Sequence, residues 1–153
     1  MDIGSTADAG IFARAYDGIV VELGVASGRV VGVSFPDEVP DDAATDHPLL
    51  DRVGAYLSGE QDHFDDVQVA LTVPTAQRSV LEAVRNVPHG ETIDLKRLAR
   101  IAGLDEESET DLDTVEEALR ANPVPLFVPD HRIEGAGATP DGVVRLLRSV
   151  ESA

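Results

Sequence analysis

Residues 122–133 read Asn-Pro-Val-Pro-Leu-Phe-Val-Pro-Asp-His-Arg-Ile. The three prolines fix the backbone dihedral φ and push each preceding residue towards an extended conformation, so a preceding helix cannot continue through this run. Its apolar residues let the segment cross the protein interior, after which Asp130, His131 and Arg132 follow in a row. Three consecutive polar side chains at the end of a buried arm indicate either a site or a hydrogen-bonded polar network.

This run resembles the active-site segment of the methylated-DNA-protein-cysteine methyltransferases, also called alkylguanine-DNA alkyltransferases. That segment reads Asn-Pro, a short apolar arm, and then Pro-Cys-His-Arg followed by Val or Ile. Asn122, Pro129, His131 and Arg132 match it, whereas Asp130 stands at the position of the cysteine. In the family this cysteine takes the alkyl group from an extruded guanine. Because the chain contains no cysteine at all, the resemblance implies a family member that transfers no alkyl group.

The composition is strongly acidic. The 153 residues include 29 Asp and Glu against 12 Lys and Arg, which gives a formal net charge of −17. Repulsion at this charge density opposes a compact state in dilute buffer, whereas at about 1 M salt the screening length falls to about 3 Å. We therefore predict a protein from the cytoplasm of a halophile.

The sequence gives no indication of a membrane segment, a metal site or a cofactor. No apolar run approaches the roughly 20 residues of a membrane-spanning helix, and the N-terminus lacks the pattern of a signal peptide. The four histidines are scattered without the spacing of metal ligands, and there is no thiolate. The acidic pairs Asp41–Asp42 and Asp65–Asp66 are interpreted as solvated surface, since no loop places enough oxygen ligands in series around a cation.

Residues 1–73 predict a small α/β domain. Two apolar runs around a Ser-Gly turn indicate a β-hairpin, which follows an extended run that starts at Ile11. A helix is expected to open at Pro48 and to close at Ser58, and the polar-apolar alternation over residues 64–73 predicts a half-buried strand. This order of hairpin, helix and strand resembles the N-terminal domain of the alkyltransferase family.

Residues 74–153 predict a winged helix-turn-helix domain, so that the whole chain is expected to be an α+β fold. Gly90 suits a turn that needs positive φ, Asp94 can cap the helix that follows it, and Gly103 ends that helix. A second helix is expected over residues 111–121. Two helices that are joined by a short polar turn beside an extended arm are typical of a winged helix-turn-helix.

The resemblance also assigns positions for DNA binding. In the family, an arginine near the start of the second helix fills the space of the extruded nucleotide, and a tyrosine just before the first helix helps to extrude it. Here Asp113 and Leu95 stand at these positions, and Arg120 is the only basic residue of the second helix. The acidic residues around Arg120 have the opposite charge to the usual electrostatic footprint of a DNA-reading helix.

Two further family features are altered. A loop of the Gly-Tyr-Ser-Gly-Gly type walls the base pocket in the family, whereas residues 135–142 contain no tyrosine. The final glutamate of the family, which orients the histidine, aligns with Val150, and a shift of one residue would bring Glu151 to its place.

Several interpretations of the surviving residues therefore stay open. Asn122, His131 and Arg132 can be structural, with side chains that hydrogen-bond to buried carbonyl and carboxylate groups. The chain can instead bind alkylated guanine in double-stranded DNA without chemistry, as a protein related to DNA alkylation repair. A third interpretation gives Asp130 a chemical role as nucleophile or general base, oriented by His131. In the alternative function, DNA binding is lost and the acidic helix makes the chain a protein-interaction or structural module.

Overall fold

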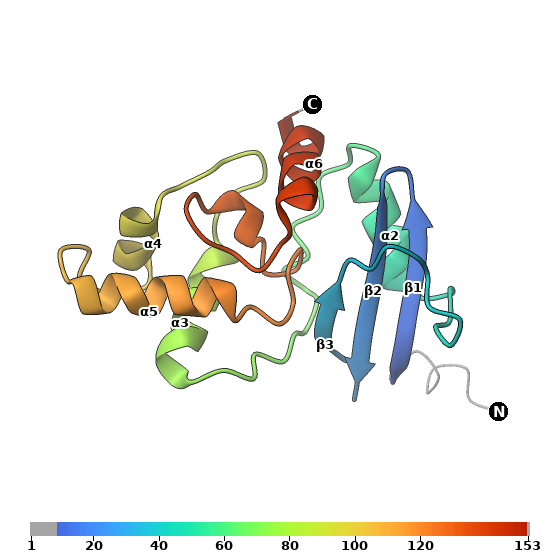
Figure 1. Ribbon diagram of the computed structural model, residues 1–153, viewed down its shortest axis with the longest axis horizontal. Coiled ribbons are helices and arrows are strands. Elements are labelled where there is room, and N and C mark those ends of the chain that lie inside the picture. Colours follow the sequence, from blue (N-terminus) through green and yellow to red (C-terminus); the bar gives the residue numbers. More distant parts are fainter. Residues whose placement is uncertain (1–8, 153) are drawn as a thin grey trace.

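The computed structural model describes residues 9–152 (Figure 1). A three-stranded antiparallel sheet has the order β1-β2-β3, with β1 at Gly10–Tyr16, β2 at Ile19–Ala26 and β3 at Arg29–Ser34. Every second residue of β2 is buried, which turns one face of the sheet towards the core. The turn before β3 places both Ser27 and Gly28 at positive φ. The predicted hairpin and the extended run before it are therefore confirmed.

Helix α2 (Pro48–Leu57) covers one face of this sheet, as Figure 1 shows. The side chain of His47 caps the helix, because its Nδ1 atom accepts a hydrogen bond from the N–H of Leu49 at 3.0 Å. The hydroxyl of Tyr16 on β1 donates to the carbonyl of Leu50 at 2.6 Å, which fixes the helix on the sheet. The buried face of α2 ends with Tyr56.

The strand predicted over residues 64–73 is wrong. The chain turns at Phe64, where φ is 51°, and only Val69 bridges to the sheet, in parallel to Val30 of β3. The alternating pattern is nevertheless explained, because Val69, Leu71 and Val73 lie partly buried against the core. The segment is thus extended, but it pairs over a single residue.

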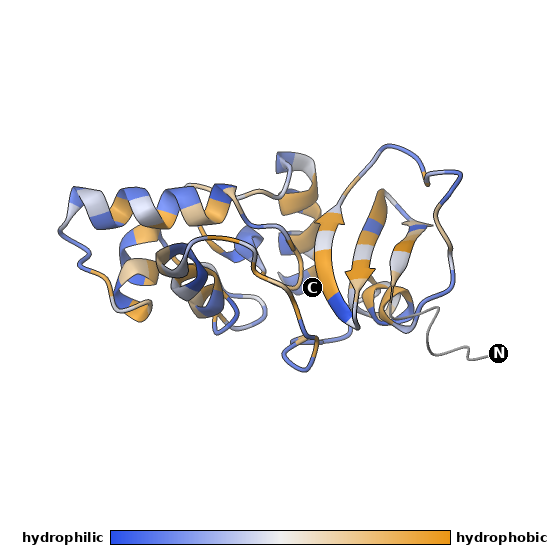
Figure 2. Ribbon diagram, turned by 90° about the horizontal axis from the view of Figure 1, so that it is seen from below, coloured by the Kyte–Doolittle hydropathy of each residue, from blue (hydrophilic) through white to orange (hydrophobic). Residues whose placement is uncertain are grey.

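Three helices form the other half of the molecule: α3 (Thr75–Val84), α4 (Leu95–Ile101) and α5 (Glu109–Arg120). The side chain of Asp94 caps α4 by accepting from the N–H of Arg97 at 2.8 Å, and both Gly90 and Gly103 have a φ of 83°. Ser108 caps α5, so this helix begins two residues earlier than expected. Figure 2 shows hydrophobic and hydrophilic positions alternating along α5, as in an amphipathic helix.

The arm of residues 122–129 leads into a short 3₁₀ helix, η1 (Asp130–Arg132), and the chain ends in α6 (Asp141–Ser152). The arm is buried, as predicted, but it bends at Leu126, where φ is 81°. Helix α6 was not predicted, although Val143, Leu147 and Val150 recur at helical spacing. In Figure 1 this helix stands between the sheet on one side and helices α4 and α5 on the other.

Buried residues of both halves join in one hydrophobic cluster, which includes Leu23 of β2, Tyr56 of α2 and Phe127 of the arm. The rings of Phe64 and Phe127 meet edge to face at 5.1 Å. The boundary between two domains near residue 73 stays a prediction, and the first eight residues of the first domain lie outside the described residues. Within residues 9–152, no helix is long and apolar enough to cross a membrane.

Candidate functional site

Asn122 closes the arm into a loop. Its side-chain oxygen accepts from the N–H of Val124 at 3.0 Å. Its side-chain amide donates to the carbonyl of Val128 and to the carboxylate of Asp130, both at 3.0 Å. Asn122 is buried, as is Pro129, which precedes η1. Both residues therefore fix the path of the backbone that delivers Asp130.

The Asp130 carboxylate is buried and hydrogen-bonded at both oxygens. Besides Asn122, it accepts from the N–H of Ala138 at 2.8 Å and from the hydroxyl of Thr139. The bare backbone of Gly137 leaves room for it, because a Cβ there would lie 3.2 Å from the carboxylate carbon. Asp130 is 1% exposed. It therefore ties the arm to the loop of residues 134–140, and no oxygen faces solvent as a free acceptor.

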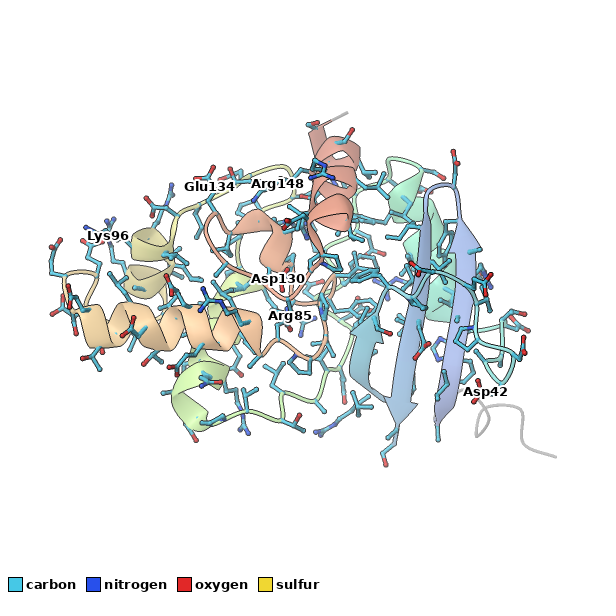
Figure 3. The ribbon with its side chains drawn as sticks, in the orientation of Figure 1. Asp42, Arg85, Lys96, Asp130, Glu134 and Arg148 are labelled. Atoms are coloured by element: carbon cyan, nitrogen blue, oxygen red, sulfur yellow. The ribbon has the colours of Figure 1, made fainter. Side chains whose placement is uncertain are left out.

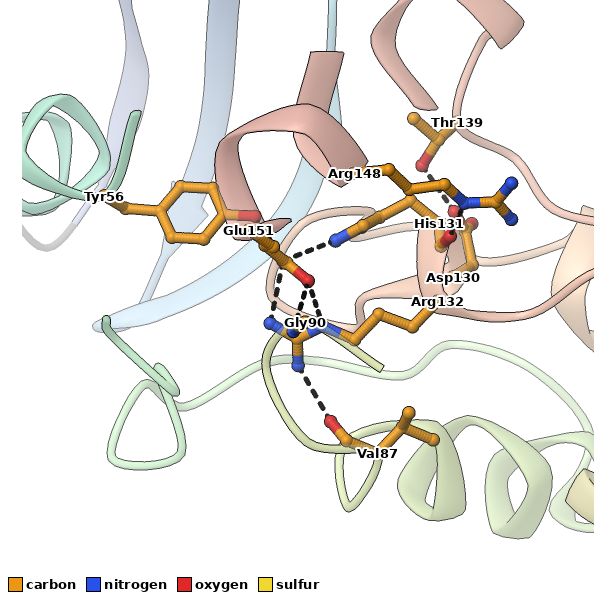
Figure 4. A network of polar contacts seen from close by, with 9 residues as sticks. All are labelled: Tyr56, Val87, Gly90, Asp130, His131, Arg132, Thr139, Arg148 and Glu151. Atoms are coloured by element: carbon orange, nitrogen blue, oxygen red, sulfur yellow. Dashed lines mark hydrogen bonds and ion pairs between the residues drawn. The ribbon is translucent and has the colours of Figure 1, made fainter. Parts of the chain in front are cut away.

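Glu151 of α6 is the centre of a second buried network (Figure 4). Its carboxylate accepts from His131 Nε2 at 2.6 Å, from Arg132 Nε at 3.0 Å and from Arg132 Nη2 at 2.9 Å. The N–H of Gly90 adds a hydrogen bond at 3.0 Å, and the Tyr56 hydroxyl also donates to this carboxylate. One side chain thus joins α2, the turn before α4, η1 and α6. Glu151, and not its neighbour, faces the histidine.

Electrostatics keep Glu151 charged. Burial by itself raises the pKa of this carboxyl group, but the hydrogen bonds from His131 and Arg132 outweigh burial and hold the pKa well below its ordinary value. The pKa of Tyr56 is raised, first by burial and then by the hydrogen bond to Glu151. The tyrosine therefore stays a neutral donor to a charged acceptor.

The lowered pKa of Glu151 predicts a loss of stability in acid. A carboxyl group whose pKa is lower in the folded state stabilises the fold above its unfolded pKa of about 4.3, and this contribution is lost as the pH falls further. We expect the difference in unfolding free energy between the native chain and Glu151→Gln to shrink below about pH 4.3. Urea unfolding at a series of pH values measures it, and a difference that stays constant down to pH 3 would contradict it.

His131 and Arg132 are held by partners other than Asp130. Arg132 Nη1 donates to the carbonyl of Val87 at 2.8 Å, and Arg148 Nε donates to the carbonyl of His131 at 2.7 Å. The Nδ1 atom of His131 is buried without a hydrogen-bond partner in the described part of the chain. The histidine is therefore oriented towards Glu151 and is not hydrogen-bonded to the Asp130 carboxylate.

Residues 75–148 match the family model described as the DNA-binding domain of 6-O-methylguanine DNA methyltransferase. Residues 75–148 belong to this alkyltransferase family. The family is related to DNA alkylation repair.

Curated relatives match more than half of the chain. A methylated-DNA-protein-cysteine methyltransferase of Metallosphaera sedula is 31% identical over 98 residues, which cover 62% of this chain and 59% of the relative. A DNA base-flipping protein of Thermus thermophilus is 37% identical over 86 residues, which cover 56% and 54% of the two chains. The chain thus spans little more than half the length of these relatives.

Solved structures share the fold over almost the full chain. The crystal structure of the O6-methylguanine methyltransferase of Mycobacterium tuberculosis has a TM-score of 0.74 at 22% identity and covers 93% of this chain and 92% of its own. The enzyme of Pyrococcus kodakaraensis has a TM-score of 0.69 at 22% identity and covers 94% and 100%. The predicted α+β fold with a winged helix-turn-helix is therefore confirmed.

The alkyltransferase resemblance assigns Leu95, Asp113 and Arg120 to DNA binding, and the structure places them as follows. Leu95 is half-buried against the loop, since a Cβ on Gly135 would lie 3.3 Å from Leu95 Cδ1. Asp113 is exposed on α5. Arg120 is also exposed, and its guanidinium lies 3.6 Å from the carboxylate of Glu116. Their roles in DNA binding stay predictions.

Among residues 9–152, no group of three or more potential metal ligands comes together. Asp41 and Asp42 are exposed, in agreement with their interpretation as surface. Asp66 is more than a solvated charge, because it forms an ion pair with Arg52 at 2.9 Å. Arg52 also holds Asp62 at 2.8 Å, and this pairing lowers the pKa of Asp62.

Proposed function

We propose that the chain is a non-catalytic alkyltransferase-like protein, which binds alkylated guanine in double-stranded DNA and does not accept the alkyl group. The observation that carries this proposal is the Asp130 carboxylate, which is 1% exposed and bound by Asn122, Ala138 and Thr139. By resemblance, this is the position of the acceptor cysteine. The proposal is supported by the DNA-binding family model over residues 75–148 and by a relative named as a DNA base-flipping protein.

Alkyl transfer to Asp130 has three physical obstacles. An attacking oxygen needs a lone pair directed at the alkyl carbon, and the carboxylate oxygens of Asp130 already accept hydrogen bonds. An ester would also accept more weakly than the carboxylate, and each buried donor left unsatisfied costs about 1–3 kcal/mol. In addition, oxygen is a harder and weaker nucleophile towards an alkyl carbon than a thiolate.

DNA binding by this chain cannot rest on a basic surface. The exposed residues of α5 include Glu109, Asp113 and Glu117, and such carboxylates repel phosphate. Affinity that comes from Lys and Arg contacts falls steeply with salt because it depends on counterion release. In molar salt this contribution is small for any protein, so shape and hydrogen bonds dominate binding and an acidic helix has a smaller disadvantage.

A binding titration in molar KCl tests the proposal. Fluorescence anisotropy is measured with two labelled duplexes that differ only in one O6-methylguanine. The proposal predicts binding of the methylguanine duplex with higher affinity than the plain duplex. Equal absence of binding to both duplexes would remove DNA as the ligand.

Reversing a charge on α5 tests whether this helix faces the DNA. Asp113→Arg is expected to raise the affinity for duplex DNA about twofold in molar KCl and by more at lower salt, because it replaces repulsion of phosphate by attraction. The matched control is Asp42→Arg, which makes the same charge change in a loop at the opposite end of the molecule (Figure 3). Equal effects of the two substitutions in the anisotropy titration would show that α5 does not face the DNA.

A second function is favoured by the charge of α5. An exposed helix face that carries Glu109, Asp113 and Glu117 suits a basic protein partner better than a nucleic acid. In that case the chain is a protein-interaction module that has lost DNA binding. Asp113→Arg then leaves both duplexes unbound, and it reduces the recovery of a specific partner from a lysate at native salinity, whereas Asp42→Arg does not.

A further inference from the structure

A groove runs between the extended segment of residues 67–73 and helix α3. Two adjoining cavities of about 390 Å³ and 550 Å³ share Arg29, Val69, Leu71 and Glu82 in their walls. Helix α3 contributes Arg78 and Glu82, and Arg85 follows at the C-terminal cap of this helix. The three residues recur at the spacing of one helix face. None of the residues that line the two cavities takes part in the hydrogen bonds of Asp130 or Glu151, so the groove does not belong to the site described above.

One edge of the extended segment is open towards this groove. The carbonyl of Gln68 and the N–H of Ala70 are hydrogen-bonded to Val30 of β3 at 3.0 and 2.9 Å. Because backbone groups of an extended chain alternate in direction, the N–H and C=O of Val69 and Leu71 point to the other side. In the described part of the chain, neither residue forms a backbone hydrogen bond there. An unpaired edge of this kind can accept a further strand.

The side chains around the open edge define the chemistry of a strand that would fit. Val69 and Leu71 are half-exposed apolar residues. Arg29 and Arg78 are exposed in the wall of the smaller cavity, and within residues 9–152 neither has a carboxylate in ion-pair distance. Glu82 is the one acidic residue of this cavity wall. The smaller cavity therefore has an excess of positive charge in a chain of net charge −17. The larger cavity also carries Asp65 and Asp66 beside Arg29 and Arg85, so the positive balance is confined to the part of the groove around Arg78.

We propose that this groove binds an extended acidic peptide segment of a partner protein. The peptide backbone adds as a strand to the open edge at Val69 and Leu71, and its apolar side chains pack on these two residues. Its carboxylates pair with Arg29 and Arg78. Backbone hydrogen bonds supply affinity in such strand addition, and the side-chain contacts supply specificity.

Nuclear magnetic resonance of the full ¹⁵N-labelled chain in molar KCl tests the proposal. The probe is a capped octapeptide that alternates valine and aspartate, and the comparison peptide replaces each aspartate by lysine. We expect the aspartate peptide to shift the amide signals of Val69 and Leu71 most strongly, while the lysine peptide leaves them unchanged. Arg78→Glu is expected to weaken the aspartate peptide about fivefold or more, since it turns an ion pair into a repulsion.

The matched control is Arg145→Glu on α6, which makes the same charge change at an exposed position outside the groove. It is expected to leave the peptide affinity unchanged, and Arg29→Glu is expected to act like the substitution at Arg78. The proposal is overturned if both peptides shift the same amides, or if neither does at saturation. It is equally overturned if duplex DNA shifts these amides, or if they shift with protein concentration alone, which would assign the groove to DNA or to a second copy.

Discussion

Glu151→Ala is expected to lower the free energy of unfolding by about 3–5 kcal/mol, because it removes the acidic partner of a buried ion pair. Arg132 would remain 4% exposed without its counter-charge. The buried Tyr56 hydroxyl and His131 Nε2 would lose the acceptor that both share. Since these groups belong to elements that are far apart in the sequence, the loss would loosen the contact of α6 with the rest of the molecule.

Urea unfolding followed by circular dichroism in molar KCl measures this change. The control is Glu117→Ala, which removes an exposed carboxylate from α5 and is expected to change the unfolding free energy by no more than about 0.5 kcal/mol. A loss at Glu151 that is as small as the loss at Glu117 would contradict the role of the buried network.

Asp130→Ala is expected to cost about 2–3 kcal/mol of unfolding free energy, because buried donors lose their acceptor. The side-chain amide of Asn122, the N–H of Ala138 and the hydroxyl of Thr139 all bind this one carboxylate. The loop of residues 134–140 would then be held less tightly to the arm. Asp130→Asn is expected to cost less, since its carbonyl oxygen keeps one acceptor.

Hydrogen exchange of the Ala138 amide gives a local measure of the same prediction. Exchange is expected to become faster in Asp130→Ala, whereas Glu134→Ala, which removes an exposed carboxylate from the same loop, is expected to leave it unchanged. Faster exchange in both variants, or in neither, would show that Asp130 does not hold the loop.

The path of the chain from the turn at Gly90 to the arm of residues 122–129 could be predicted from local sequence. Prolines around the arm, the Asp94 cap and the positive-φ glycines act within a few residues, so their effects are visible without a structure. The region of residues 64–73 shows the limit of this reasoning. Its alternation reports which side chains are buried, but β3 pairs with it at Val69 only, and pairing is decided by distant parts of the chain.

The partners of the site residues were largely beyond sequence reasoning. Tyr56 and Gly90 lie 95 and 61 residues from Glu151 in the sequence, and no motif joins them. Thr139 carries no signal that marks it as a donor to Asp130. The glutamate itself could be placed only to within one residue, because the loop before α6 differs from the loop of the family. The helical periodicity of residues 141–152 would have distinguished Glu151 from Val150, because it places Leu147 and Glu151 on one buried face of α6.

Transfer of a radiolabelled methyl group decides whether Asp130 is a structural residue or a chemical acceptor. The protein is incubated in molar KCl with duplex DNA that carries labelled O6-methylguanine, then denatured and separated from the DNA. The Metallosphaera sedula relative, incubated with the same duplex in its own buffer, serves as the positive control. We predict that no label stays on this chain, because the Asp130 carboxylate is 1% exposed and engaged by hydrogen bonds, and its oxygen is a weaker nucleophile towards an alkyl carbon than a thiolate. Label recovered in the peptide that contains Asp130 would contradict this prediction.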